Sequence, residues 1–296
     1  GVQTCALPIY SAKGVRKVVF WNKELLFCDI KPTCYAISVK KENLKRHLQD
    51  LKRKENFATD FQKEKLTYVV SERSSNMIKR AEGVDLASQF NKAKNIELAC
   101  QKLNGLVIKP GEVFSFWKLV GKISEKKGYK AGRVIERNKL ILGIGGGICN
   151  LANTINLLVI HSPLLITEFH THSDALAPDE TGRIPLNAGT SVSYNHIDYR
   201  FKNTTNQSFQ LMLWCEGEVL HAVLRSEREL PYTYDILEEN HHFTKEKEKF
   251  YRISKIYKAT LSKTSGDMVE KTLIWDNHSE VMFDYGLIPK DQIRFS

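Results

Sequence analysis

The stretch Gly143-Ile-Gly-Gly-Gly-Ile-Cys149, followed by the apolar run Leu151–Ile160, is the most unusual part of this sequence. The spacing of apolar residues after the glycines predicts a helix over residues 149–161, closed by Pro163. A dinucleotide-binding G-x-G-x-x-G motif would need glycine at position 148, and a P-loop would need Gly-Lys-Ser/Thr, so both are excluded. We interpret the stretch as a flexible loop that ends in a cysteine at the start of a helix.

The position of Cys149 at the start of a helix affects the reactivity of its thiol. Unpaired N–H groups and the helix dipole stabilise a thiolate at a helix N-terminus, which predicts a lowered pKa for Cys149. The same N–H groups can hold the oxyanion of an acyl-transfer intermediate. The candidate substrate-binding or oxyanion residues are Gly145, Gly146, Gly147 and Asn150. The alternative interpretation is a buried cysteine that fills a tight junction between loop and helix.

A cysteine nucleophile needs a base, and the next predicted strand carries two histidines. His170 and His172 are two positions apart, so they share one face of a strand. The alternative is a partly exposed pair that only takes part in a hydrogen-bond network. Candidates for a group that orients the base are Asp174, Asn187 and Asp198, and the sequence does not choose among them.

A zinc site is a further alternative, because Cys149, His170 and His172 are residue types that zinc uses. The three lack the closely paired spacing of structural zinc sites, and the sequence offers no evident fourth ligand. We therefore predict neither a metal nor a cofactor.

Composition limits the remaining classes of protein. The 296 residues carry 44 Lys and Arg against 34 Asp and Glu, a net charge of +10, and 42% are hydrophobic. No apolar run approaches the roughly 20 residues of a membrane helix, so no span is expected. The charge would suit an anionic partner, but no motif for sequence-specific nucleic-acid binding is present. The six cysteines include no C-x-x-C pair, which favours reduced thiols.

The pattern along the chain predicts an α+β protein with a mixed or antiparallel sheet. Residues 1–79 form a basic N-terminal region, of which 1–9 fit no later pattern and are interpreted as a candidate artefact. Residues 80–225 form the central domain, and 226–296 form a C-terminal β segment. The compartment, cytoplasm or cell envelope, is left open, since a native start could lie upstream.

Individual elements follow from local patterns. Short strands are expected within 15–39, and an amphipathic helix within 40–65, where Leu44, Leu48 and Leu51 share one face. That segment carries nine basic and five acidic residues, which we interpret as a solvated helix face rather than a patch for an anionic partner. Residues 226–248 are expected to be a polar linker. The other predicted elements are a helix at 84–104, strands at 106–108, 164–172 and 192–201, and hairpins at 134–142, 209–225 and 250–275.

Several ordered motifs from about residue 90 to 225 resemble the VanW family, which is named for a glycopeptide-resistance gene cluster. The motifs with the highest specificity are the Pro-Gly-Glu-x-Phe-Ser-Phe element and the Gly-Gly-Gly-x-Cys element. The full set is Asn95-Ile-Glu-Leu-Ala99, Leu103-Asn-Gly105, Ile108-Lys-Pro-Gly-Glu-Val-Phe-Ser-Phe-Trp117, Gly128-Tyr129, Gly145-Gly-Gly-Ile-Cys149 and Ile197-Asp198.

The resemblance implies L,D-transpeptidation of peptidoglycan, with the cysteine of the glycine loop, here Cys149, as nucleophile. It favours His172 over His170 as base, because His172 matches the more widely shared histidine. Two departures stand out: Asn150 replaces a common glutamine, and Gly189-Thr190-Ser191-Val192 lacks a common aspartate. The expected partner is peptidoglycan or its precursors. The competing expectation is a non-catalytic accessory protein that binds a wall precursor or a protein partner.

Overall fold

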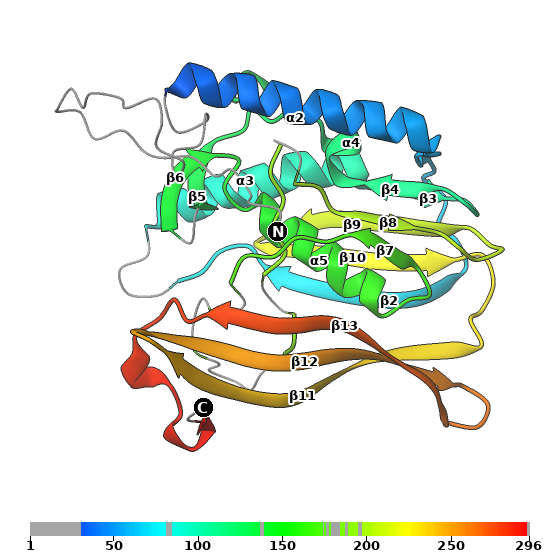
Figure 1. Cartoon of the computed structure of the whole chain (residues 1–296). Coiled ribbons are helices and arrows are strands. Elements are labelled where there is room, and N and C mark those ends of the chain that lie inside the picture. Colours follow the sequence, from blue (N-terminus) through cyan, green and yellow to red (C-terminus); the bar gives the residue numbers. More distant parts are fainter. Residues whose placement is uncertain are drawn as a thin grey trace.

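A computed structural model describes residues 31–80, 85–136, 139–173, 175, 178, 184–186, 189–194 and 197–294. Helices pack on a predominantly antiparallel sheet in the central domain, and a second sheet of long strands lies beside it (Figure 1). The α+β class predicted from the sequence is confirmed. The helices are α2 (Pro32–Arg53), α3 (Leu86–Leu103), α4 (Phe116–Val120) and α5 (Ile148–Ile160), with short 3₁₀ turns at Glu125–Lys127, Tyr285–Leu287 and Lys290–Gln292.

The central domain is built on a five-stranded antiparallel sheet, in the order β1-β3-β9-β10-β2. Side chains of β10 alternate between fully and partly buried, as expected for a strand with one face on a core. The strands are β1 (Asp60–Phe61), β2 (Tyr68–Asn76), β3 (Leu106–Ile108), β9 (Phe209–Glu216) and β10 (Val219–Ser226).

Two helices cover this sheet and carry the core. In α5 every residue from Leu151 to Ile160 is buried, which explains why its apolar run is nearly continuous. Helix α3 is capped by Asp85, whose carboxylate accepts hydrogen bonds from the N–H groups of Ala87 and Ser88. Smaller sheets flank the core: β4 (Val113–Ser115), β8 (Arg200–Lys202) and β7 (Leu165–Glu168) form one, and β5 (Ala131–Glu136) with β6 (Lys139–Ile144) forms a hairpin.

The C-terminal sheet contains three long antiparallel strands and a short parallel one. The predicted hairpin within 250–275 is confirmed, but the expectation of a linker over 226–248 is wrong, because most of that segment is a strand. Its many polar side chains suit a sheet with a face in water. The strands are β11 (Tyr232–Glu246), β12 (Lys249–Ser262), β13 (Met268–Glu280) and β14 (Ile293–Arg294).

The N-terminal region differs most from expectation. Residues 32–39, predicted as strand, belong to helix α2, while 15–31 lie outside or at the edge of the described residues. Helix α2 ends at Arg53 rather than continuing toward residue 65, because Lys54 adopts a left-handed conformation with φ 51°. The helices predicted at 84–104 and 149–161 and the hairpin at 209–225 are confirmed. Strands β7 and β8 are shorter than the predicted 164–172 and 192–201.

Candidate active site at the start of α5

Cys149 is the second residue of α5 and is partly exposed. Gly147 caps the helix with φ 97°, and no side chain makes a capping hydrogen bond at its N-terminus. The thiol donates a weak hydrogen bond to the carbonyl oxygen of Val192, at 3.6 Å. Burial raises the pKa of the Cys149 thiol, and this outweighs the backbone hydrogen bonds that lower it. The lowered pKa predicted from the sequence is therefore wrong for this arrangement, and the thiol is protonated at neutral pH.

The glycine loop before Cys149 is held tightly by its neighbours. The Gly145 N–H donates to the carbonyl of Lys130 at 3.0 Å, and the Asn95 side-chain amide donates to the carbonyl of Gly146 at 2.9 Å. A Cβ atom on Gly146 would lie only 2.5 Å from the carbonyl carbon of Gly132 in β5. The first two glycines thus allow the backbone of the loop to approach the β5–β6 hairpin closely.

The residues on either side of Ile148 and Cys149 differ in their surroundings. Gly147 packs against Lys92 of α3, where a Cβ would come within 2.4 Å of that side chain. Asn150 follows the cysteine, and its Oδ1 atom is buried with no hydrogen-bond donor among the described residues. This oxygen is an unused acceptor one residue from the thiol. A ligand N–H that reached it would meet an unsatisfied polar atom.

An extended segment, residues 189–192, connects the cysteine with the histidines. On one edge, the Gly189 carbonyl accepts from the His172 N–H and the Ser191 N–H donates to the His170 carbonyl, both at 2.8 Å. The other edge faces α5: the Thr190 hydroxyl donates to Asn153 at 2.6 Å, and the Val192 carbonyl accepts from the thiol. The Cys149 thiol and the backbone of the two histidines therefore lie on opposite edges of this segment. Within the described residues, no hydrogen bond joins the thiol to either imidazole.

His170 has a carboxylate partner that the sequence analysis missed. Its Nε2 atom lies 2.9 Å from Oε1 of Glu168. Arg46 of α2 donates two hydrogen bonds to the same carboxylate, at 2.6 and 2.8 Å. Burial acts to raise the pKa of Glu168, but the hydrogen bonds from His170 and Arg46 lower it to about 2. The spacing of Glu168 and His170, two positions apart in an extended chain, was the available signal for this pair.

His172 is more enclosed than His170. Burial lowers the pKa of its imidazole, against a hydrogen bond between Nδ1 and the Ser173 carbonyl at 3.1 Å. The ring is therefore neutral at pH 7, and the contact with a carbonyl makes Nδ1 the protonated nitrogen. Nε2 is then the nitrogen that can accept a proton.

Asp198, one of the three candidates for orienting the base, makes other contacts. Its carboxylate accepts from the Ser115 hydroxyl at 2.6 Å, the Trp117 N–H at 3.0 Å and the Arg200 guanidinium at 2.7 Å. These bonds fix the start of α4 and the strand β8. The other two candidates, Asp174 and Asn187, lie outside the described residues.

The described residues do not supply a set of ligands for the zinc site considered as an alternative. Among the residues that the structure describes, no three histidine, cysteine, aspartate or glutamate side chains gather as a metal site would require. The set of Cys149, His170 and His172 left open by the sequence is divided by the segment 189–192.

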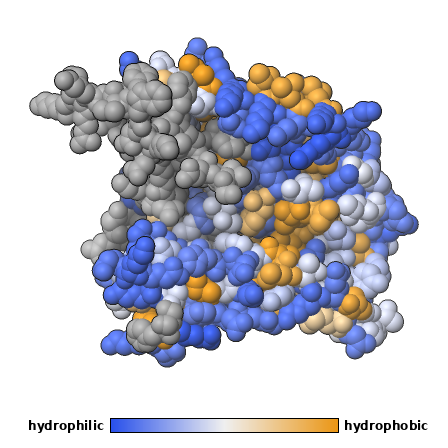
Figure 2. All heavy atoms as spheres, in the orientation of Figure 1, coloured by the Kyte–Doolittle hydropathy of each residue, from blue (hydrophilic) through white to orange (hydrophobic). Residues whose placement is uncertain are grey.

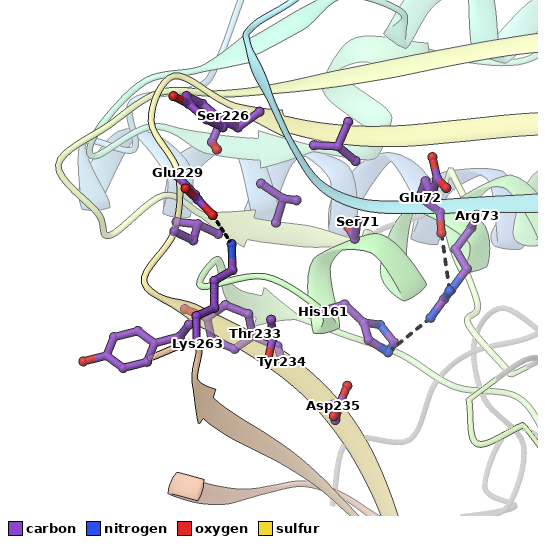
Figure 3. A pocket seen from close by; sticks show the side chains of 15 residues that line it. Ser71, Glu72, Arg73, His161, Ser226, Glu229, Thr233, Tyr234, Asp235 and Lys263 are labelled. Carbon is purple, nitrogen blue, oxygen red and sulfur yellow. Dashed lines mark hydrogen bonds and ion pairs between the residues drawn. The ribbon is translucent and has the colours of Figure 1, made fainter. Parts of the chain in front are cut away.

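Two cavities lie near the other end of α5. The first, about 540 Å³, is shown in Figure 3. There His161 lies 3.2 Å from Arg73 through Nε2 and 2.7 Å from the Leu157 carbonyl through Nδ1, and burial lowers the pKa of its imidazole. A helix of 13 residues is about 20 Å long, so this cavity is far from Cys149.

The second cavity, about 700 Å³, is more apolar and lies between β7 and the C-terminal sheet. Lys258 of β12 lines it and donates to the carbonyl of Ser162. Burial lowers the pKa of Lys258 to about 8. Both cavities lie between the central domain and the C-terminal sheet, away from the cysteine.

Comparison with known proteins finds similarity centred on the domain that holds the glycine loop. The family model described as VanW like protein matches residues 91–225. Vancomycin B-type resistance protein VanW of Enterococcus faecalis (strain ATCC 700802 / V583) is 26% identical over 218 residues, 74% of this chain and 79% of that protein. Uncharacterized protein YoaR of Bacillus subtilis (strain 168) is 31% identical over 121 residues, 41% of this chain and 38% of that protein. No solved structure matches the chain.

The family match covers the segment that holds most of α3, the glycine loop, α5 and the strands β7 to β10. The alignment with the enterococcal protein extends beyond this segment to most of both chains. Residues 91–225 are therefore a VanW-like domain, and the chain is similar to the enterococcal VanW protein over most of its length.

Proposed function

We propose that this protein is a cysteine acyltransferase of the L,D-transpeptidase type that acts on peptidoglycan stem peptides. The observation that carries the proposal is Cys149, a partly exposed cysteine at the uncapped N-terminus of α5. Asn150 follows it in the chain, and its buried Oδ1 accepts no hydrogen bond within the described residues. The name of the enterococcal relative links that protein to vancomycin resistance, and cross-links that avoid a D-Ala-D-Ala donor would give such resistance a chemical basis.

The reaction would begin with a protonated thiol, because burial raises the pKa of Cys149. A neutral base must therefore remove the proton as the sulfur attacks, and the lowered pKa of His172 keeps its imidazole neutral. His170, held by Glu168, is the second candidate base. Since no hydrogen bond joins the thiol to either ring within the described residues, the proton would pass through a bridging water or substrate group.

The sulfur would attack the carbonyl of the diamino acid that precedes the terminal D-Ala of a tetrapeptide stem. N–H groups in the first turn of α5 would stabilise the oxyanion. The C–N bond then breaks, the proton taken from the thiol moves to the departing amine of D-Ala, and a thioester remains on Cys149. The amine of a second stem attacks this thioester, forms the cross-linking amide and returns a proton to the sulfur.

The test is intact-protein mass spectrometry after incubation with a tetrapeptide stem. We expect the wild type to gain the mass of the stem minus D-Ala, and Cys149→Ala to gain nothing. Cys34→Ala, which removes another partly exposed thiol, is the matched control and should form the adduct normally. An adduct that survives in Cys149→Ala would contradict the assignment of the nucleophile.

The rate of acylation tests which histidine acts as the base. We expect His172→Ala to slow acylation by about 100-fold or more, and His170→Ala to have a smaller effect. Because the pKa of His172 lies below its ordinary value of 6.5, the wild-type rate should still be high at pH 6.5 and fall only at lower pH. Equal rates in wild type and His172→Ala would exclude His172 as the base.

A second function, non-catalytic binding of a wall precursor, is favoured by one observation: the thiol is protonated and bonded to a carbonyl rather than to a base. In that case the stem peptide should bind reversibly, by calorimetry, without any covalent adduct. Cys149→Ala should then bind the peptide as tightly as the wild type.

A further inference from the structure

Helix α2 presents its apolar side chains to the outside of the molecule. Ile37, Leu44, Leu48 and Leu51 are 56%, 59%, 56% and 61% exposed. At 100° per residue, they fall within an arc of about 60°, so they form one stripe along the helix. Figure 2 shows apolar groups along the upper edge of the molecule, over α2, with hydrophilic groups beside them.

The opposite face of α2 is fixed to the central domain by charged contacts. Arg46 binds Glu168 through two hydrogen bonds. Asp50, one turn further on, binds the guanidinium of Arg200 at 2.6 and 3.2 Å and lies 3.3 Å from Lys118. These contacts determine the rotation of the helix about its axis. The apolar stripe therefore cannot turn toward the core without breaking a buried ion pair.

The exposed lysines and the acidic residues of α2 lie on different faces of the helix. Exposed lysines flank the apolar stripe on both sides: Lys40 on one side, and Lys41, Lys45 and Lys52 on the other. The two acidic residues of the helix, Glu42 and Asp50, lie on the half that faces the protein. The outward half of α2 thus combines an apolar stripe with basic borders and carries no acidic side chain.

We propose that this outward half of α2 docks on the surface of an anionic lipid bilayer. A stripe of leucines enters the boundary between headgroups and acyl chains, while lysines on both sides contact anionic headgroups. The proposal is independent of the acyl-transfer chemistry. Helix α2 would then lie in the membrane interface, with its axis parallel to the plane of the bilayer.

A second copy of this chain is a poorer occupant of the same face. In the heptad that keeps Leu48 in the core with Ile37, Leu44 and Leu51, the remaining core position along this stretch is Lys41. A parallel paired helix would bring the Lys41 side chains of both copies together in the seam. A nucleic acid would match the lysines but would leave the leucines in water.

The experiment is co-sedimentation of the full chain with lipid vesicles. We expect binding to vesicles that contain phosphatidylglycerol and little binding to pure phosphatidylcholine. The triple variant Leu44→Gln, Leu48→Gln, Leu51→Gln keeps the charge and should lower the partition coefficient by about 1,000-fold, since each buried leucine contributes on the order of tenfold. Replacing Lys41 and Lys45 by Gln should lower it by about fivefold for each lysine.

The control variant carries Leu273→Gln and Leu287→Gln, which remove exposed leucines of the C-terminal region, and it should bind like the wild type. Melting temperatures should be unchanged in all variants, because every substituted side chain is exposed. Absence of wild-type binding to anionic vesicles would overturn the proposal, as would equal binding of the leucine variant and its control. Self-association without lipid that is lost in the leucine variant would also overturn it, in favour of a second copy.

Discussion

At the scale of single residues, the glycines before Cys149 serve close packing. Gly145 and Gly146 are buried, and their backbone contacts residues of α3 and of the segment that enters β5. Any side chain on Gly146 would meet the backbone of Gly132 rather than a flexible group. The loop therefore sets the position of the cysteine through the fit between two stretches of backbone.

This fit predicts a large effect of a small substitution. Gly146→Ala should lower the free energy of unfolding by about 2 kcal/mol, because its Cβ would overlap the backbone of Gly132. Gly286→Ala is the control, since its nearest neighbour is a side-chain oxygen of Asp284 at 3.3 Å. We expect its effect to stay within about 0.5 kcal/mol. Chemical denaturation measures both, and similar small effects would contradict the packing argument.

At the scale of elements, α2 is attached to the domain largely through ion pairs between charged side chains. Asp50 is buried, and the Asp198 carboxylate holds the other side of the Arg200 guanidinium. Hydrogen bonds from Arg200 and Lys118 lower the pKa of Asp50 although burial opposes them. A helix held in this way can keep its apolar face outside.

Removing one partner of this pair should be costly. Asp50→Ala should lower the free energy of unfolding by about 3 kcal/mol, because it removes one of the three carboxylates, those of Asp50, Asp198 and Glu168, that lie beside the buried Arg200 guanidinium. Glu42→Ala removes the exposed pair with Lys45 on the same helix and should change stability by less than about 0.5 kcal/mol. Urea titration compares the two variants, and equal values would argue against the ionic attachment.

At the scale of the whole molecule, acid should loosen the connection between α2 and the central domain. The pKa of Glu168 is about 2 in the folded protein, against an ordinary value of 4.5. A carboxyl with a lowered folded pKa stabilises the protein fully above its ordinary pKa, and this contribution is lost as pH falls through the folded value.

The free energy of unfolding should therefore decline between pH 4.5 and about 2. A shift of this size corresponds to a contribution on the order of 3 kcal/mol. Glu168→Gln, which cannot titrate, should show a shallower decline over the same range, with the two stability curves converging at the acid end. Denaturant titration at several pH values measures this difference. Parallel curves for the two proteins would show that Glu168 carries no such linkage.

Prediction from the sequence worked best where a pattern is local. The helix that begins near Cys149 and the hairpin at 209–225 follow from apolar spacing and turn residues, and both are present. The strand β11 was missed because its side chains are largely polar, so its stability depends on pairing with β12 rather than on its own pattern. The beginning of α2 was missed for a related reason: its Ile37 and Val39 favour strands locally.

The candidate site was predicted in part. Its cysteine, histidines and glycine loop are residues that the sequence singles out, and their catalytic roles stay a prediction. The pairing of Glu168 with Arg46 was not found, since 122 positions separate them, whereas Glu168 itself stands two positions from His170 and was overlooked. The direction of the pKa shift of Cys149 was also missed, because burial depends on segments distant in the chain, such as Val192.

The sequence by itself determined the α+β class, the VanW-like motifs and the cysteine at the start of a helix. Each of these depends on patterns among residues that are close together in the sequence. Only the tertiary structure decided which way the leucines of α2 face, which carboxylate binds His170, and that a segment of backbone separates Cys149 from the histidines. These features arise where distant segments meet, and there burial and pairing of charges outweigh local preference.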